Sequence, residues 1–161
     1  MCSRIVYRDI KQENIGFDFR GSVKVFDLGL CKGLSPSLKS KEGLGYLLTP
    51  RTGSVPYMAP EVVLMNPYDC QADVFSFAIL LWEILSLRTA FKGYSRWDFL
   101  NRVARNRERP KLNRQWPTLT RSMIREAWDN DPLKRPRMKR VAVLLQGDIN
   151  EMTFEAKTDV A

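Results

Sequence analysis

The most hydrophobic segment of the chain, Gln71 to Leu87, is predicted to form a helix that is apolar on most of its sides. Such a helix is typical of a buried core element. Its uncharged run extends only from Val74 to Trp82, nine residues, whereas a membrane-spanning helix needs roughly 20. We therefore expect a central core helix and no membrane span.

Two later segments carry apolar residues at the three- to four-residue spacing of amphipathic helices. Ser95, with Asp98 three residues later, is a variant of the capping box and would open a helix over residues 96–106. A second helix is expected around residues 119–128. The side chains predicted to face the core are Phe99, Leu100 and Val103 in the first helix, and Leu119, Met123, Ile124, Ala127 and Trp128 in the second.

The last helix is predicted over residues 137–146, because Pro136 is favoured where a helix begins. Gly147 would end this helix, and the polar residues 150–161 would follow as a tail that frays. The side chains expected to face inward are Met138, Val141, Ala142 and Leu145.

Strand patterns occur near the start of the chain. Ile15 to Phe17 reads as a short strand and the alternating run Val23 to Phe26 as its return, with Gly21 available for a left-handed turn residue. This hairpin would present Asn14 at one end and Asp27 at the other, on the same side. The expected fold class is therefore mainly α, with one small β-hairpin.

Three motifs lie in order along this part of the chain. Residues 5–14 read I-V-Y-R-D-I-K-Q-E-N, Asp27-Leu28-Gly29 follow the return strand, and Ala59-Pro60-Glu61 come thirty residues later. They resemble the H-R-D-x-K-x-x-N catalytic loop, the D-F-G turn and the A-P-E segment of eukaryotic protein kinases. One triplet would be a weak signal, because Asp and Asn are common in turns, but three in order are specific.

Two positions depart from the family pattern. Tyr7 stands where the family has His, and Leu28 where it has Phe. Both positions serve packing in the family, so the resemblance implies that an aromatic and an aliphatic side chain stack there. Neither change removes a catalytic group.

A fourth segment, residues 128–136 (W-D-N-D-P-L-K-R-P), resembles the W-x-x-D-P-x-x-R-P segment late in kinase domains. The resemblance covers about residues 3–147 and only the larger, helical lobe; the helix from Asp73 onward looks most like that of the tyrosine-kinase-like group. It implies a partial kinase domain and an absent N-terminal lobe. The implied parts are the domain over residues 1–149, made of a catalytic loop 5–14, an activation segment 27–61 and a helical subdomain 62–149, and a polar tail 150–161.

The resemblance implies a role for each residue of the catalytic motifs. Asp9 would accept the proton of the substrate hydroxyl, and Lys11 would neutralise the γ-phosphoryl group of ATP as it moves. Asn14 and Asp27 would hold Mg²⁺ on the ATP phosphates. A lysine two residues after the aspartate is the serine/threonine-kinase pattern. The implied catalytic residues are Asp9, Lys11 and Asn14, and those that bind the ATP–Mg²⁺ cofactor are Lys11, Asn14 and Asp27.

No periodicity is present between Gly29 and Tyr57, and a loop this long in a compact domain is usually functional or disordered. By the resemblance it is the activation segment, in which Ser54 would contact Asp9 and Lys11 as part of the substrate-binding lip. The possible phosphoacceptors of this segment are Ser35, Ser37, Ser40, Thr49 and Thr52. A phosphate on Thr49 or Thr52 is expected to order the loop, because both lie just before Gly53. Arg8 is the expected partner of such a phosphate, because an arginine fork binds phosphate oxygens bidentately.

Three further residues are expected to have structural roles by the same resemblance. Glu61 would form an ion pair with Arg135, which would tie the activation segment to the last helices. Asp73 would hold the backbone of the Tyr7–Arg8 turn. A buried carboxylate needs such donors, because it is costly when unpaired.

The composition excludes several kinds of site. The chain has no His, which excludes His-based acid–base catalysis and His metal ligands. Its three cysteines have no C-x-x-C spacing, so neither a zinc site nor a disulfide framework is indicated. Residues 2–4 lead straight into the first motif without a signal peptide, so we expect an intracellular, cytoplasmic protein.

The net charge of +8 raises the question of nucleic acid or acidic lipid as a partner. The basic residues are concentrated after Arg96, in clusters over residues 102–114 and 134–140. No nucleic-acid-binding motif accompanies them, and the aromatic spacing builds no stacking platform. We expect a solvated basic face and no nucleic-acid partner.

Two classes of function follow from the sequence. In the first, the chain is a fragment of a protein serine/threonine kinase, which transfers the γ-phosphate of ATP to Ser and Thr hydroxyls of a protein substrate. In the second, it is a non-catalytic binding module that keeps the substrate-docking face without the nucleotide-binding lobe. Retention of the four catalytic and metal-binding residues favours the first. The absent glycine-rich loop and lysine strand, on which nucleotide binding depends, favour the second.

Overall fold

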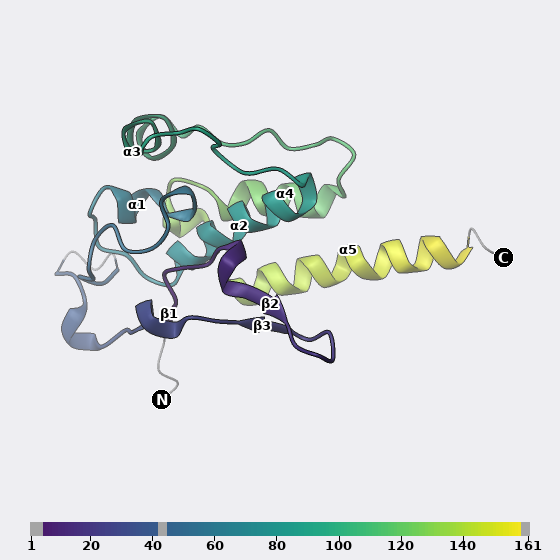
Figure 1. Ribbon diagram of the computed structural model, residues 1–161, viewed down its shortest axis with the longest axis horizontal. Coiled ribbons are helices and arrows are strands. Elements are labelled where there is room, and N and C mark those ends of the chain that lie inside the picture. The colour runs from purple at the N-terminus through teal and green to yellow at the C-terminus, as the bar shows by residue number, and fades with distance from the viewer. Residues whose placement is uncertain (1–4, 42–44, 159–161) are drawn as a thin grey trace.

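The computed structural model describes residues 5–41 and 45–158, and the side chains of residues 5–41 and 45–151. Helices are its main regular structure, with two small two-stranded sheets at one side (Figure 1). The helices are α1 (Pro60–Val63), α2 (Gln71–Ser86), α3 (Arg96–Asp98), α4 (Thr118–Ala127) and α5 (Met138–Thr158). The strands are β1 (Ile5–Val6), β2 (Ile15–Phe17), β3 (Val23–Val25) and β4 (Lys32–Gly33). The expected mainly α fold with a small hairpin is confirmed.

Short helical turns connect these elements and carry much of the loop structure. Four of them lie within the expected catalytic loop and activation segment, and the last lies within residues 128–136. The 3₁₀ turns are η1 (Gln12–Asn14), η2 (Leu28–Leu30), η3 (Pro36–Leu38), η4 (Val55–Tyr57) and η6 (Pro132–Lys134).

The predicted hairpin is formed by β2 and β3, which pair antiparallel with Ile15 opposite Val25 and Phe17 opposite Val23. Gly21 has a φ of +77°, the left-handed conformation expected for the turn. A second pairing was not predicted: Val6 of β1 lies opposite Lys32 of β4. Strands of two residues are too short to show a period of alternating residues, so no pattern in the sequence predicts this pairing.

Helix α2 is the centre of the core, as predicted. Phe75, Ala78, Ile79 and Leu80 are buried, and the helix packs against α4 and η4. Each such large apolar side chain contributes about 1.5–3 kcal/mol when fully buried. The helix ends at Leu87, whose φ of +54° stops further helical hydrogen bonding. Within residues 5–41 and 45–158, no helix combines the length and apolar character that crossing a membrane requires.

The helix predicted over residues 96–106 is present but changes type after its first turn. The capping box is formed: Ser95 Oγ accepts from Asp98 N at 3.1 Å, and Asp98 Oδ2 accepts from Ser95 N at 3.0 Å. Beyond α3, residues Phe99–Arg105 form a π-helix (η5), with Phe99 and Val103 buried. A π-helical stretch of this kind is frequent at functional sites.

Helix α4 buries most of its predicted stripe, including Met123, Ile124 and Ala127. The prediction was wrong for Leu119, which is 42% exposed. Thr120 takes the inward position instead, where its backbone N–H donates to Asp148 of α5 at 2.7 Å and its hydroxyl donates to the same oxygen. A buried polar pair between two helices thus decides which face of α4 turns inward.

Helix α5 does not end at Gly147, so that prediction was wrong: the helix continues to Thr158, through most of the predicted polar tail. A glycine inside a helix costs only about 1 kcal/mol relative to alanine. The contact of the adjacent Asp148 with α4 favours helical backbone there. Figure 1 shows the end of α5 projecting beyond the other elements.

The inward face of α5 also differs from the prediction. Val141 is buried and Leu145 packs against the core as expected, but Met138 and Ala142 are exposed. Leu144 contacts the core in place of Ala142. The helix meets α4 along its Val141–Asp148 side, and the position of α4 could not be read from the local pattern.

Candidate active site

Helix α2 positions the predicted catalytic loop through the side chain of Asp73. The Asp73 carboxylate accepts the backbone N–H groups of Tyr7 at 2.7 Å and Arg8 at 2.9 Å, as the sequence predicted. Burial raises the pKa of Asp73, and these two N–H groups partly offset that rise. Arg8 has a φ of +71°, a conformation that costs a side-chain-bearing residue of order 1–3 kcal/mol and persists only where the surroundings enforce it.

Asp9 follows this turn and is buried with both carboxylate oxygens occupied. Oδ1 accepts from Ser54 N at 3.1 Å and Ser54 Oγ at 2.9 Å. Oδ2 accepts from Asn14 Nδ2 at 2.9 Å and lies 2.8 Å from Lys11 Nζ. Burial alone would raise the pKa of Asp9, but the hydrogen bonds from Lys11, Ser54 and Asn14 outweigh it and hold the pKa below its usual value.

Lys11 joins Asp9 to the activation segment. Its Nζ donates to Ser54 Oγ at 3.0 Å, and its hydrogen bond to Asp9 raises the pKa of the Lys11 amine. The predicted contact of Ser54 with Asp9 and Lys11 is therefore present. The Ser54 hydroxyl is an aliphatic hydroxyl that donates a hydrogen bond to Asp9. The position of the Asp9 carboxylate therefore allows it to accept a hydrogen bond from a hydroxyl group.

Gly53 allows the activation segment to approach the catalytic loop this closely. Its φ is +104°, and a Cβ at this position would lie 2.2 Å from the carbonyl oxygen of Arg8. No side chain fits at that distance. The backbone contact between the two loops therefore requires glycine, which the sequence analysis did not recognise.

The two predicted metal ligands lie at the joined ends of the hairpin. Phe26 N donates to the carbonyl of Asn14 at 2.8 Å, and Asp27 follows directly. Tyr7 adds a second link, because its hydroxyl donates to the carbonyl of Phe26; burial raises the pKa of this hydroxyl. Tyr7 thus makes a polar contact at this position, and its stacking stays a prediction. Leu28, which was expected to stack, is 66% exposed, so that prediction was wrong.

The side chains at these positions fit a magnesium site. Asn14 uses its amide nitrogen for hydrogen bonds to Asp9 at 2.9 Å, which leaves the amide oxygen as its possible ligand atom. Asp27 has one oxygen bonded to Gly29 N at 3.1 Å and an exposed side chain. The described residues contain no group of three or more His, Cys, Asp or Glu that could hold a metal. Mg²⁺ needs no such group, because it is usually held by one or two carboxylates together with substrate phosphates.

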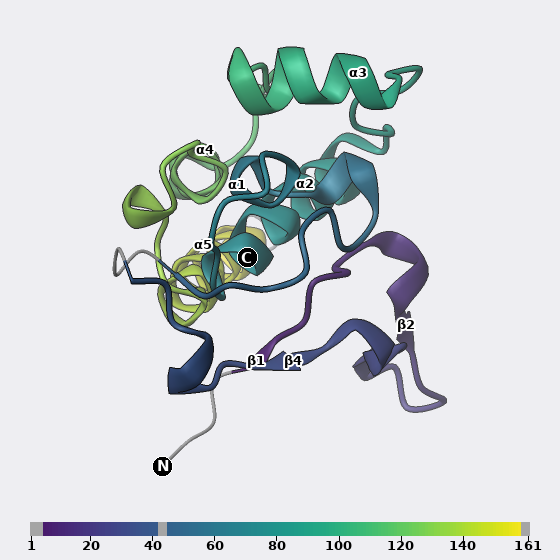
Figure 2. The same cartoon turned by 90° about the vertical axis from the view of Figure 1, so that its left-hand side faces the viewer.

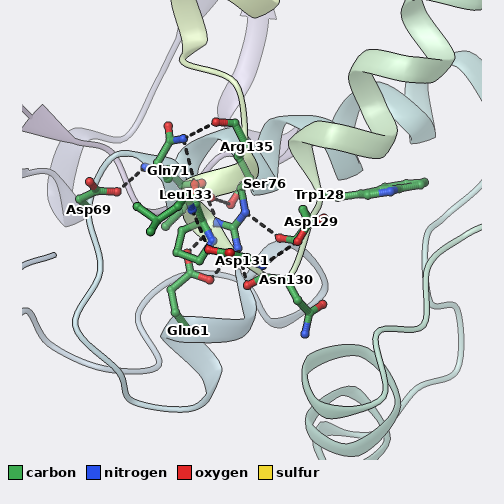
Figure 3. Close-up of polar contacts among 12 residues, drawn as sticks. Glu61, Asp69, Gln71, Ser76, Trp128, Asp129, Asn130, Asp131, Leu133 and Arg135 are labelled. Atoms are coloured by element: carbon green, nitrogen blue, oxygen red, sulfur yellow. Dashed lines mark hydrogen bonds and ion pairs between the residues drawn. The ribbon is translucent and has the colours of Figure 1, made fainter. Parts of the chain in front are cut away.

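The ion pair predicted between Glu61 and Arg135 is confirmed. It is buried and bidentate, with Nη1–Oε1 at 2.7 Å and Nη2–Oε2 at 2.8 Å. Arg135 also donates to the carbonyl oxygens of Asp129 and Gln71, both at 2.8 Å (Figure 3). The guanidinium therefore joins α1, the start of α2 and the segment before α5.

Sequence reasoning missed a second buried carboxylate, Glu83 on α2. It accepts from the Tyr57 hydroxyl at 2.5 Å, Gln12 Nε2 at 2.9 Å and Ala90 N at 2.7 Å. Burial, followed by the bond to Glu83, raises the pKa of Tyr57 well above its ordinary range. The available signal was an acidic residue inside an otherwise apolar helix.

The predicted phosphoacceptors lie close to Arg8 without touching it directly. Arg8 Nη1 donates to the Tyr68 hydroxyl at 3.4 Å, and that hydroxyl donates to the carbonyl of Thr49 at 2.8 Å. Thr52 Oγ1 also bonds the Thr49 carbonyl, at 2.9 Å. Phosphorylation of either threonine stays a prediction.

Comparison with known proteins agrees with the resemblance found in the sequence motifs. The protein kinase domain family matches residues 2–143. The dual specificity protein kinase shkB of Dictyostelium discoideum is 36% identical over 143 residues, which are 88% of this chain and 21% of that protein. The serine/threonine-protein kinase STY17 of Arabidopsis thaliana is 31% identical over 150 residues, 93% of this chain and 25% of that protein. The chain thus spans about a fifth to a quarter of the length of these relatives.

Proposed function

The chain belongs to the protein kinase domain family, and we propose that it forms the catalytic and substrate-binding lobe of a protein serine/threonine kinase. In this function the γ-phosphate of ATP is transferred to a hydroxyl group of a protein substrate. The observation that carries the proposal is the arrangement around Asp9, an ionised carboxylate 2.8 Å from Lys11 and already hydrogen-bonded to the hydroxyl of Ser54.

The chemistry proposed for these residues follows from their positions. Asp9 accepts the proton of the substrate hydroxyl as the oxygen attacks the γ-phosphorus. Lys11 places a positive charge beside that oxygen and neutralises the negative charge of the γ-phosphoryl group as it is transferred. Asn14 and Asp27 offer oxygen ligands to Mg²⁺ on the ATP phosphates, and the bound ATP–Mg²⁺ supplies the phosphoryl group and neutralises its charge. Phosphoryl transfer needs this positioning and charge stabilisation more than covalent catalysis.

Specificity for serine and threonine is supported by Lys11 and by the names of some relatives. STY17 is named a serine/threonine kinase, whereas shkB is named a dual specificity kinase. An assay with matched Ser, Thr and Tyr peptides separates these two outcomes. We also propose a cytoplasmic location, which microscopy of the tagged full-length protein tests.

A non-catalytic binding module is the second candidate. It concerns the 161 residues taken by themselves, which do not include the glycine-rich loop and lysine strand that fix ATP phosphates in kinases. Loose positioning of ATP is costly, because orientation can supply roughly 7–11 kcal/mol of a barrier. We therefore expect the 161-residue chain by itself to transfer phosphate at no useful rate.

The test compares the 161-residue chain with the same chain fused to the N-terminal lobe of a family relative. Activity in the fusion alone is expected, with a loss of about 10²–10⁴-fold in Asp9→Asn, because a general base contributes that much. Asp27→Ala should also abolish activity. Glu13→Gln is the matched control, since Glu13 is an exposed carboxylate of the same loop whose side chain forms no hydrogen bond or salt bridge with the residues that the structure describes.

Three outcomes separate the candidates. Activity that depends on Asp9 only in the fusion supports the kinase proposal. Activity of the bare chain that Asp9→Asn removes would refute the expectation for the isolated lobe. A folded fusion that binds ATP but stays inactive would favour the binding module.

A further inference from the structure

A cavity of about 310 Å³ lies between the activation segment and α3, next to the catalytic loop. Figure 2 shows α3 and its π-helical continuation lying across this side of the molecule, above α1. The apolar part of the wall is formed by Val55, Met58, Val63, Trp97, Phe99 and Leu100. The volume is near the lower end of the range of about 300–1,000 Å³ for ligand pockets, so it suits one large side chain better than a complete cofactor.

The cavity lies beside the proposed active site along the chain. Gly53 and Val55 line it, and the residue between them, Ser54, bonds Asp9 through both its N–H and its hydroxyl. A polypeptide whose hydroxyl lies at Asp9 would therefore place a residue only a few positions away in the cavity, because an extended chain advances about 3.3–3.6 Å per residue.

Two arginines on the wall give the cavity a positive charge. Arg51 comes from the activation segment and Arg96 from the first turn of α3. Neither guanidinium has a hydrogen bond or ion pair with any residue that the structure describes. No acidic residue lines the cavity, and the carboxylate of the nearby Asp98 is occupied by the N–H and hydroxyl of Ser95.

Trp97 is the most exposed apolar residue of the wall, at 71%. Tryptophan and arginine are enriched among the residues that carry most binding energy at interfaces. A tryptophan left open beside two unpaired guanidinium groups therefore favours a ligand that is apolar at one point and acidic at the next.

We propose that this cavity selects the peptide substrate, by holding a large apolar side chain that has an acidic residue beside it, within a few positions of the phosphorylated hydroxyl. Val63 and Phe99, two buried residues of the wall, contribute apolar surface to hold the apolar side chain, and Arg51 and Arg96 pair with the acidic side chain. This rests on the proposed function for its biological meaning, but the binding it describes needs no phosphoryl transfer.

The test measures peptide binding to the 161-residue chain by NMR, through the indole N–H signal of Trp97, which Trp97→Phe assigns. Three sets of peptides carry one serine and a neighbouring pair: Leu-Glu, Leu-Lys or Ala-Glu. In each set the pair is placed at one, two or three residues on either side of the serine. At one or more placements, the Leu-Glu peptide should bind at least about fivefold more tightly than the other two.

Charge reversal tests the two arginines. Arg51→Glu and Arg96→Glu should each weaken Leu-Glu binding about three- to tenfold, because each replaces an attraction with a repulsion at a partly exposed site. The double variant should prefer the Leu-Lys peptide. Lys139→Glu is the matched control, since Lys139 is likewise an exposed base in the first turn of a helix and lies outside the cavity.

Several outcomes would overturn the proposal. One is the absence of any placement that distinguishes the peptides; another is a preference that the double variant retains. Equal binding of a polyanion such as an oligonucleotide, with no effect of Leu→Ala in the peptide, would indicate a general anion surface. If the double variant loses its fold, as circular dichroism would report, the single variant Arg96→Glu decides, because an acidic residue is favourable in a first helical turn.

The result is independent of the kinase assay. Selective binding by a chain whose fusion is inactive would leave the cavity assignment intact and refute the kinase function. An active fusion that phosphorylates Leu-Glu and Leu-Lys peptides equally well would support the kinase function and refute the cavity assignment.

Discussion

The α2 core and the β2–β3 hairpin both contain strongly apolar side chains but differ in what covers them. Phe75 of α2 is fully buried, whereas Phe17 of β2 is 73% exposed and its neighbours Val23 and Val25 are more than half exposed. A two-stranded hairpin is marginally stable alone. Composition therefore does not identify the stable region; contact with other elements does.

The hairpin keeps its place through a few polar contacts to the helical part. Asp73 on α2 holds the Tyr7–Arg8 turn, and the Tyr7 hydroxyl binds the carbonyl of Phe26 at the end of β3. The proposed catalytic residues lie along this connection. The helical core supplies stability and holds the loops that carry the proposed catalytic residues.

The largest effect is expected from Phe75→Ala. It should lower the free energy of unfolding by about 4–5 kcal/mol, the upper part of the range for a core Phe→Ala substitution. The reason is that Arg109 and Arg135, whose guanidinium groups lie 4.8 and 5.2 Å from its ring centre, also lose an aromatic contact. Urea denaturation measures the change. Phe17→Ala is the matched control and should fall within about 0.5 kcal/mol of the parent; equal losses would contradict the comparison.

Glu61→Ala should cost about 3–4 kcal/mol, because it leaves the Arg135 charge buried without its carboxylate. The remaining carbonyl acceptors keep the loss below the top of the range for broken buried pairs. The comparison is Glu108→Ala, which removes the exposed pair with Arg102 together with the hydrogen bond from the Tyr94 hydroxyl, and should cost about 1 kcal/mol or less. A similar cost for both variants in urea denaturation would show that burial is not the deciding factor.

Asp73→Asn should cost about 1–3 kcal/mol, the usual range when a buried donor or acceptor loses its partner. The amide has only one acceptor oxygen for the two N–H groups of Tyr7 and Arg8. Hydrogen exchange should become faster at these two amides and remain slow in α2. Unchanged protection at Tyr7 and Arg8 would show that α2 does not hold the catalytic loop.

Acid should remove the stability that the ionised Asp9 carboxylate contributes to the fold. Burial would raise the pKa of Asp9, but its donors hold the pKa below the ordinary value of 3.8. Such a group adds stability above pH 3.8, and that stability is lost as the pH falls through its lower, folded-state pKa. Asp9→Asn should therefore flatten the loss of stability below pH 3.8, which urea titrations at several pH values measure. An unchanged profile would indicate an unshifted carboxylate.

The smallest effect on stability is expected on the exposed face of the hairpin. Phe17→Ser and Val25→Thr should each change the free energy of unfolding by no more than about 0.5 kcal/mol. They should lower self-association, because an exposed apolar face favours contacts between copies. Sedimentation velocity of the parent and the double variant measures this. If the substitutions leave self-association unchanged, the surface responsible for it lies outside the hairpin.

Much of the fold and of the contact network could be predicted from the sequence. The central helix, the hairpin, the capping box at Ser95 and the Glu61–Arg135 pair are all present. The contacts of Asp9 with Lys11 and Ser54 are present too, and the catalytic roles assigned to them are proposals. Periodicity and local capping depend on neighbours within a few residues, and the motif resemblance supplied the distant pairs.

Tertiary structure alone decided the features in which a distant partner overrides the local pattern. Asp148 turns Thr120 inward in place of Leu119 and lies beside Gly147, where α5 continues. Glu83 joins Gln12 and Tyr57 across the core. In each case a buried polar group must find its hydrogen-bond partner, and that partner comes from an element 26 or more residues away, so spacing along the chain cannot reveal it.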